Sequence, residues 1–143
     1  VKVKKEQSTS LITNNLESLE NFSVPEPGQV IEGDVAIPTE TLKANPETEN
    51  KLRTFEVKGE NGLISPSDFR VYQNDIVNLK LKAKDQDYDL KLETYNINIR
   101  VKKGEIKTIE FQAITSGIFN FYCSLCSNSS KPIARLIVVP KQK

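Results

Sequence analysis

The chain has 143 residues, with 20 basic and 19 acidic side chains, and it contains no histidine, methionine or tryptophan. This length and a hydrophobic content of 37% predict one small domain with a tail. A formal net charge of +1, with no basic run longer than a lysine doublet, disfavours nucleic acid as a partner. The absence of histidine excludes an imidazole general base, Ser-His-Asp and Cys-His nucleophile systems, and histidine-containing metal centres. The composition therefore favours a protein that is not an enzyme, and no small-molecule substrate is evident.

Residues 1–53 are predicted to form an extended tether or linker. They are rich in Glu, Asn, Thr, Ser and Pro, and their apolar residues keep neither an alternating nor a helical spacing for long. We expect a short helix within residues 11–22 and, within residues 30–37, a segment that adds an edge strand to the domain after it. Because the sequence begins at Val1 rather than at methionine, one hypothesis is that a signal peptide or a membrane anchor has been removed. The tether would then lift a domain off a membrane, and the alternative is an ordinary terminus draped on the surface or disordered.

Residues 54–143 are predicted to form the folded domain. Apolar and polar residues alternate there with a period of two, which is typical of half-buried strands. Turn signals such as Asn61-Gly62 and Ser116-Gly117 separate the alternating runs. The pattern predicts an all-β antiparallel sandwich or barrel of seven or eight short strands. The alternation is clearest in six segments: residues 77–82, 89–92, 97–102, 109–113, 119–123 and 134–138.

The last two predicted strands resemble a known family. Residues 117–124 read Gly-Ile-Phe-Asn-Phe-Tyr-Cys-Ser, and a short loop separates them from the aliphatic residues 134–139. A glycine, an aromatic strand that ends in Cys-Ser, a ligand loop and a closing aliphatic strand closely resemble the C-terminal end of cupredoxins. Residues 69–79, 87–92 and 101–105 are similar to three earlier parts of the same family. The resemblance implies a cupredoxin-like Greek-key antiparallel β-sandwich with an extended N-terminal segment.

The cysteine pair narrows this resemblance. Cys123-Ser-Leu-Cys126 is similar to the loop of the binuclear-copper cupredoxins, of which the periplasmic domain of cytochrome c oxidase subunit II is the best-known case. That family has three residues between its cysteines, one more than this chain, and then a histidine and a methionine. The resemblance puts Tyr88 at the position of the first copper histidine, Ser130 at that of the second and Ile133 at that of the methionine. It therefore implies a degenerate copper site in which only the two thiols remain.

Three uses of Cys123 and Cys126 stay open. They could form a structural disulfide in an oxidising compartment, which would contribute about 2 kcal/mol through the short loop it closes. Two thiolates can also bind Cu(I), a soft ion that accepts few ligands. A Cys-x-x-Cys pair can finally act as a redox dithiol. A zinc site would need two further ligands, from carboxylates such as Asp87 or Asp89.

Three alternating carboxylates precede and enter one of the predicted strands. Asp85, Asp87 and Asp89 would lie on one side of this strand or of the loop before it. They could collect a hard cation such as Ca²⁺, which prefers oxygen ligands. The other interpretation is a solvated face on which the lysines of residues 80–91 balance the carboxylates in surface pairs.

These observations predict a non-catalytic cupredoxin-like module without a cofactor. We expect it to be extracytoplasmic, in the periplasm or at the cell surface, and tethered to a membrane through its N-terminal side. Its role would be structural or protein-binding, with a protein partner in a membrane or envelope assembly. The first alternative is a copper-binding or electron-transfer protein that uses Cys123 and Cys126. The second alternative is a thiol-disulfide oxidoreductase.

Overall fold

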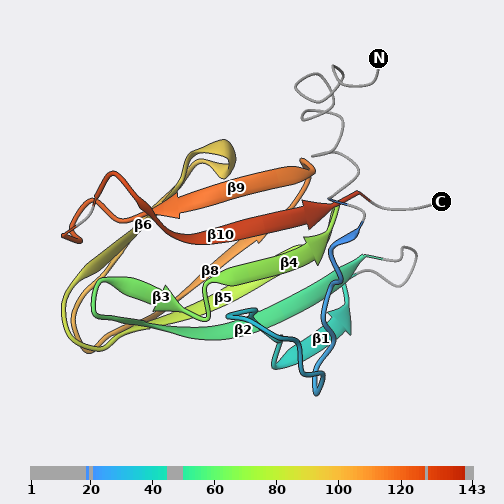
Figure 1. The fold of residues 1–143 in the computed structure, drawn as a ribbon, viewed down its shortest axis with the longest axis horizontal. Helices are drawn as coiled ribbons and strands as arrows, with labels where there is room; N and C mark the ends of the chain where they lie inside the picture. The colour runs from blue at the N-terminus through green and yellow to red at the C-terminus, as the bar shows by residue number, and fades with distance from the viewer. Residues whose placement is uncertain (1–18, 20, 45–49, 128, 141–143) are drawn as a thin grey trace, which may run out of the picture.

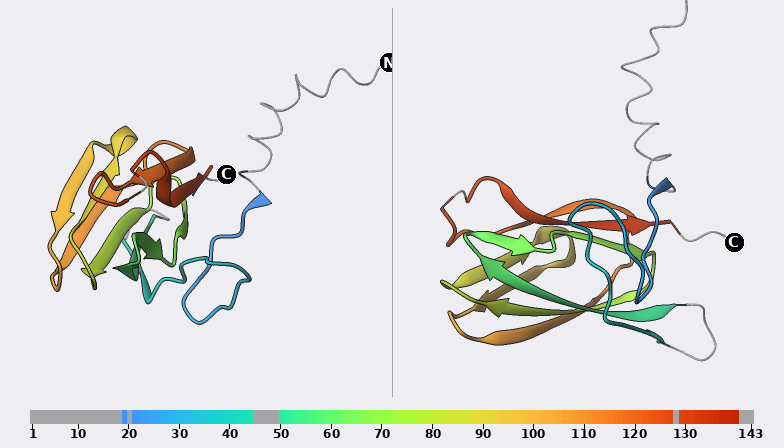
Figure 2. Two further views of the ribbon diagram at one scale, coloured as in Figure 1. Left: turned by 60° about the vertical axis from the view of Figure 1, so that its left-hand side comes forward. Right: turned by 60° about the horizontal axis from the view of Figure 1, so that its bottom comes forward.

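The computed structural model describes residues 19, 21–44, 50–127 and 129–140 of the chain. Within them, ten strands form two sheets that pack face to face as a sandwich (Figures 1 and 2). The elements are β1 (Glu40–Lys43), β2 (Lys51–Glu60), β3 (Leu63–Ser65), β4 (Asp68–Tyr72), β5 (Ile76–Ala83), β6 (Tyr88–Leu92), the 3-10 helix η1 (Glu93–Tyr95), β7 (Ile97–Val101), β8 (Ile106–Gln112), β9 (Gly117–Tyr122) and β10 (Pro132–Val139).

The strand order explains why the fold is a sandwich rather than a simple meander. The first sheet has the order β1-β2-β5-β8, with β3 paired to β2, and the second has the order β4-β10-β9-β6-β7. The chain therefore crosses repeatedly from one sheet to the other, and the predicted all-β cupredoxin-like sandwich is confirmed. Two pairs, β2 with β5 and β4 with β10, are parallel instead of antiparallel. Parallel neighbours need a long crossover, and the alternation of side chains carries no information on which strands a crossover brings together.

The core lies between the two sheets. In β5, Val77 and Leu79 are at most 2% exposed, as the alternation predicts. Phe55 of β2 contacts Phe69 of β4 edge to face across the two sheets, with ring centroids 5.4 Å apart. Within the second sheet, Phe69 makes the same kind of contact with Phe121 of β9 at 6.0 Å. Each such pair contributes about 0.5–1.5 kcal/mol beyond the area it buries.

The sandwich begins earlier in the chain than the predicted boundary at residue 53, which falls inside β2. Strand β1 pairs with β2 in antiparallel register, Glu40 opposite Thr54. Before it, Val35 forms a parallel bridge with Asp68, and Ala36 is 1% exposed. The extra edge strand expected within residues 30–37 is thus a single bridge, and the true edge strand is β1. Such short pairings escape sequence analysis because they are too brief to establish an alternation.

Leu19 and residues 21–26 also contact the sandwich. Leu19 and Val24 are buried in a small cluster with Ile137 and Val139 of β10. The guanidinium group of Arg70 lies over the ring of Phe22, 4.9 Å from its centroid. This part of the expected tether is therefore packed on the second sheet (Figure 1). The helix expected within residues 11–22 lies largely outside the described residues.

Arg53 joins the start of β2 to the turn between β4 and β5 through a buried ion pair, and to the N-terminal segment through a hydrogen bond. Arg53 is 1% exposed and Asp75 is 0% exposed, and Arg53 Nε donates to Asp75 Oδ2 at 2.7 Å. Asp75 also accepts hydrogen bonds from the backbone N–H groups of Lys51 and Tyr72. Arg53 Nη1 donates to the carbonyl of Pro25 at 3.3 Å. Buried charges are tolerated when they are paired and hydrogen-bonded in this way.

Among the described residues, no helix has the length and the apolar character needed to cross a membrane.

Candidate functional site

The cysteine loop joins β9 to β10. Cys123 and Cys126 are 0% and 6% exposed, and their sulfur atoms form a disulfide with a Cα–Cα distance of 5.4 Å. The backbone N–H of Cys126 donates to the carbonyl of Cys123 at 3.3 Å, so the pair closes a single turn. The structure therefore brings the two cysteines together as a disulfide requires. With both sulfurs buried, exchange with an external thiol would need the loop to open.

Asp89 of β6 holds this loop from the neighbouring strand. Its carboxylate accepts hydrogen bonds from Ser124 Oγ at 2.5 Å and from the backbone N–H of Leu125 at 3.0 Å. Burial raises the pKa of Asp89, but the hydrogen bonds from Ser124 and Leu125 outweigh burial and hold the pKa below its usual value. Both carboxylate oxygens are thus engaged by the two residues between the cysteines. Asp89 is therefore a positioning residue for the loop.

The side chain of Tyr88, at the position expected for the first copper histidine, forms hydrogen bonds with other parts of the protein. Its side chain is fully buried, and its hydroxyl donates to Asp85 Oδ1 at 2.9 Å while it accepts from the backbone N–H of Gly62 at 3.0 Å. Burial raises the pKa of Tyr88 to about 12, so the hydroxyl stays protonated at neutral pH. A protonated phenol is a poor metal ligand. The bulk of Tyr88 is accommodated because Gly59 faces it: a Cβ at Gly59 would lie 2.7 Å from Tyr88 Cε1.

The two other positions that the resemblance assigns to copper ligands also lack an imidazole or a thioether. Ser130 is exposed on the loop, whereas Ile133 is 5% exposed and belongs to the main core cluster together with both cysteines. Aliphatic carbon cannot take the place of a thioether or an imidazole. Within the described part of the chain, no group of three or more His, Cys, Asp or Glu side chains could hold a metal ion. The residues present therefore do not fit the histidine-containing copper centre that the fold family implies.

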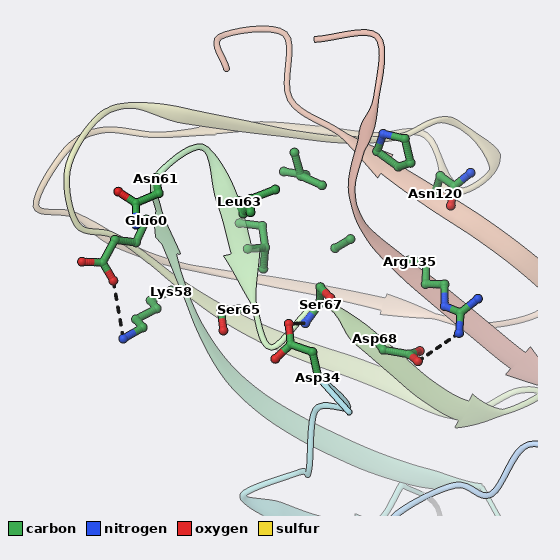
Figure 3. Close-up of a pocket in the computed structure, with 14 residues that line it drawn as sticks. Asp34, Lys58, Glu60, Asn61, Leu63, Ser65, Ser67, Asp68, Asn120 and Arg135 are labelled. Atoms are coloured by element: carbon green, nitrogen blue, oxygen red, sulfur yellow. Dashed lines mark hydrogen bonds and ion pairs between the residues drawn. The ribbon is translucent and has the colours of Figure 1, made fainter. Parts of the chain in front are cut away.

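Ile133 also lines a groove of about 740 Å³ beside the loop (Figure 3). Four of the five charged groups in this groove form ion pairs. Arg135 Nη2 lies 3.1 Å from Asp68 Oδ2, and Lys58 Nζ lies 3.6 Å from Glu60 Oε1. The fifth, Asp34, accepts a hydrogen bond from a backbone N–H at 3.1 Å. Because each charged group has a partner, the groove does not single out a charged ligand.

The three alternating aspartates tie down three different segments instead of meeting at one cation. Asp85 Oδ2 accepts from the backbone N–H of Asn61 at 2.8 Å, and Asp87 Oδ1 accepts from that of Lys103 at 2.8 Å. The third, Asp89, binds the cysteine loop as described above. The hydrogen bond from Asn61, followed by that from Tyr88, lowers the pKa of Asp85. Within the described residues none of the three aspartates forms an ion pair with the lysines of residues 80–91, so the expected surface pairs are absent.

The role of these aspartates as hydrogen-bond acceptors for neighbouring loops was not predicted, although their spacing in the sequence points to it. Aspartates at alternate positions at the start of a strand lie at the end of the sheet where neighbouring loops turn. Their short side chains accept hydrogen bonds from the free N–H groups of such loops.

Residues 35–138 match the sequence model of the cupredoxin-like domain. The chain belongs to this family. The match begins at Val35, the residue that forms the parallel bridge with Asp68. No curated protein matches the chain.

Solved structures with this fold include several copper proteins. The metal-binding domain of a Cu(I)-exporting P-type ATPase of Streptococcus pneumoniae, determined with Cu(I), is 12% identical with a TM-score of 0.55, and the match covers 82% of this chain and 96% of that one. The periplasmic domain of subunit II of cytochrome oxidase from Bradyrhizobium japonicum is 18% identical with a TM-score of 0.51, over 67% and 88% of the two chains. A copper-binding protein solved by NMR in its apo form is 15% identical with a TM-score of 0.53, over 74% and 96%. At these identities the likeness shows the fold alone.

Proposed function

We propose that this cupredoxin-like domain is a non-catalytic structural or protein-binding module in which a disulfide and Asp89 hold the former ligand loop in place of a metal. The observation that carries the proposal is the hydrogen bonding of the Tyr88 hydroxyl, which donates to Asp85 and accepts from the backbone N–H of Gly62. Ile133, at the methionine position, is part of the apolar core and supports the same conclusion.

The proposed location is extracytoplasmic, in an assembly at a membrane or envelope. Disulfides persist in oxidising compartments such as the periplasm and the cell surface, which fits the Cys123–Cys126 bond. The similarity to a periplasmic oxidase domain is in keeping with this location. The proposal includes attachment through the N-terminal side of the chain, where Leu19, Phe22 and Val24 pack on the sandwich.

The second candidate function is Cu(I) binding by the reduced cysteine pair. It is favoured by the placement of both sulfur atoms in one turn, with Gln86 Nε2 3.9 Å from Cys126 Sγ. Two thiolates suffice for Cu(I), and the similar ATPase domain was determined with this ion. Under this candidate, reduction of the disulfide would be the step that makes the site available.

Metal loading of the full chain distinguishes the two candidates. The oxidised chain is incubated with Cu(II), the reduced chain with Cu(I) under anaerobic conditions, and both are desalted before copper is quantified and the visible spectrum recorded. The proposed function predicts no retained copper, no thiolate-to-copper absorption band and no free thiol in the protein as purified.

The control is the variant Cys123→Ser/Cys126→Ser. Stoichiometric copper in the reduced chain that this variant loses would overturn the proposed function and establish the second candidate. Copper retained equally by the variant would be non-specific and would leave the proposed function in place.

A further inference from the structure

The outer face of the first sheet carries a cluster of lysines. β5 buries Leu79 and Leu81, so the alternating residues Lys80 and Lys82 point away from the core, and Lys84 follows the end of the strand. Parallel pairing of β2 with β5 sets Lys58 directly opposite Lys82. Like charges opposite each other on one face reduce the stability of a sheet. We call Lys58, Lys80, Lys82 and Lys84 the lysine cluster.

The lysine cluster lines a groove of about 830 Å³. Apolar surface is present in the same groove, where Ile106 of β8 is 61% exposed and Pro66 forms part of the wall. Of the residues that line it, all within the described part of the chain, Glu56 alone is acidic. A chain with a net charge of only +1 thus concentrates four lysines against one glutamate in a single hollow.

Among the described residues, most of this positive charge forms no ion pair, although the pairing of β2 with β5 sets Glu56 opposite Lys80. Lys58 Nζ lies 3.6 Å from Glu60 Oε1 at the edge of the groove. Across the residues that the structure describes, no carboxylate oxygen lies within 4.0 Å of the ammonium groups of Lys80, Lys82 or Lys84. An anionic partner would meet three exposed ammonium groups without having to displace an existing ion pair.

We propose that this groove binds an acidic segment of a partner protein in extended conformation, with carboxylates at every second residue. Lys80, Lys82 and Lys84 are two residues apart along β5 or directly after it, a repeat of about 6.6 Å that an extended peptide shares. Intervening apolar side chains of the segment would contact Ile106 and Pro66. This inference rests on the proposed function as a protein-binding module and names the chemistry of its partner.

Two other anionic partners fit the groove less well. No aromatic side chain lines it, so it offers no stacking platform for single-stranded nucleic acid. Its lysines line a hollow formed by β2, β5, β8 and the end of β3, whereas a bilayer presents a broad flat surface that favours a flat or convex basic face.

Binding of a labelled peptide to the full chain tests the inference. The probe is an eight-residue peptide of alternating Glu and Val with a fluorescent label, and a peptide of the same composition with its four Glu residues grouped at one end is the comparison. We expect fluorescence anisotropy to show tighter binding of the alternating peptide. The variant Lys80→Glu/Lys82→Glu should weaken this binding by about tenfold or more, because it replaces two attractive contacts by two repulsive ones.

The matched control variant is Lys43→Glu/Lys51→Glu, which makes the same charge change where β1 pairs with the start of β2. Lys51 is five residues before the residue of β2 that pairs with Lys80, about 16 Å along the strand. The control should weaken binding less than about twofold at 0.15 M salt, since exposed charges beyond a Debye length are screened. Circular dichroism establishes that both variants are folded. Equal weakening by the two variants, no peptide binding, or no preference for the alternating peptide would overturn the inference.

Vesicles with anionic lipid and an oligothymidylate complete the series. Either one would overturn the assignment to an acidic protein segment if it bound more tightly than the alternating peptide and if Lys80→Glu/Lys82→Glu weakened that binding. Because the copper experiment is separate, failure here with no copper retained leaves the proposed non-catalytic module standing. Stoichiometric copper that the Cys123→Ser/Cys126→Ser variant loses overturns that proposal whatever the peptide does.

Discussion

Replacement of Asp89 by alanine should loosen the cysteine loop and destabilise the protein. The variant removes the acceptor for Ser124 Oγ and for the Leu125 N–H, at 2.5 and 3.0 Å. A hydrogen bond to a charged group contributes about 1.5–3 kcal/mol. Ser124 and Leu125 are both exposed, so water replaces part of what the two donors lose. We therefore expect Asp89→Ala to lower the free energy of unfolding by about 2–3 kcal/mol, less than the full sum for two such bonds.

Urea unfolding of the oxidised protein at pH 7, followed by far-UV circular dichroism, measures this loss. Asp87→Ala is the matched control, because Asp87 also accepts one backbone N–H but is exposed to water. It should cost less than about 1 kcal/mol. An Asp89→Ala variant within about 0.5 kcal/mol of the wild type, or no more destabilised than the control, would refute the role of Asp89 in holding the loop.

Three further predictions concern acid stability, packing and the buried ion pair. Because the pKa of Asp89 is lowered in the folded state, its contribution is complete above the unfolded pKa of about 3.9 and is lost as the pH falls through the folded value. Asp89→Asn should therefore lose less stability than the wild type between about pH 5 and pH 2 in the same urea assay, and parallel losses would contradict this. Gly59→Ala places a methyl group against the buried ring of Tyr88 and should lower the free energy of unfolding by about 1–3 kcal/mol. An unchanged melting temperature would contradict this prediction. Asp75→Asn removes the buried counter-charge of Arg53, which keeps only the exposed Glu26 at 3.2 Å, and should cost about 3–5 kcal/mol. A cost below about 1 kcal/mol in chemical unfolding would show that the pair is dispensable.

The strands and their buried faces could be predicted from the sequence because they depend on local alternation. Val77, Leu79 and Leu81 of β5 are buried as the pattern predicts. The edge strand β1 and the bridge at Val35 could not be predicted, since each is too short to establish a period. The direction of pairing was equally hidden, because it depends on crossovers between the sheets and not on the side chains of one strand.

The candidate site was predictable to the level of residue type. Tyr88 and Ile133 cannot supply imidazole or thioether ligands in any conformation, and the sequence alone establishes this. What the Tyr88 hydroxyl does instead depends on Asp85 and on Gly62 of the turn between β2 and β3, which tertiary structure brings to 2.9 and 3.0 Å. The role of Asp89 was hidden for the same reason, because its partners lie 35 and 36 residues further along the chain.

The charged residues show most clearly what the sequence determines and what tertiary structure decides. The composition establishes a net charge of +1, and this value, without long basic runs, indicated a chain that does not gather phosphates. The alternation in β5 puts Lys80 and Lys82 on one face, but only the parallel register with β2 adds Lys58 opposite Lys82. Sequence determines how many charges a chain carries and on which face of a strand each lies. Tertiary structure decides which of them become neighbours, because electrostatic interaction depends on distance in space and not on separation along the chain.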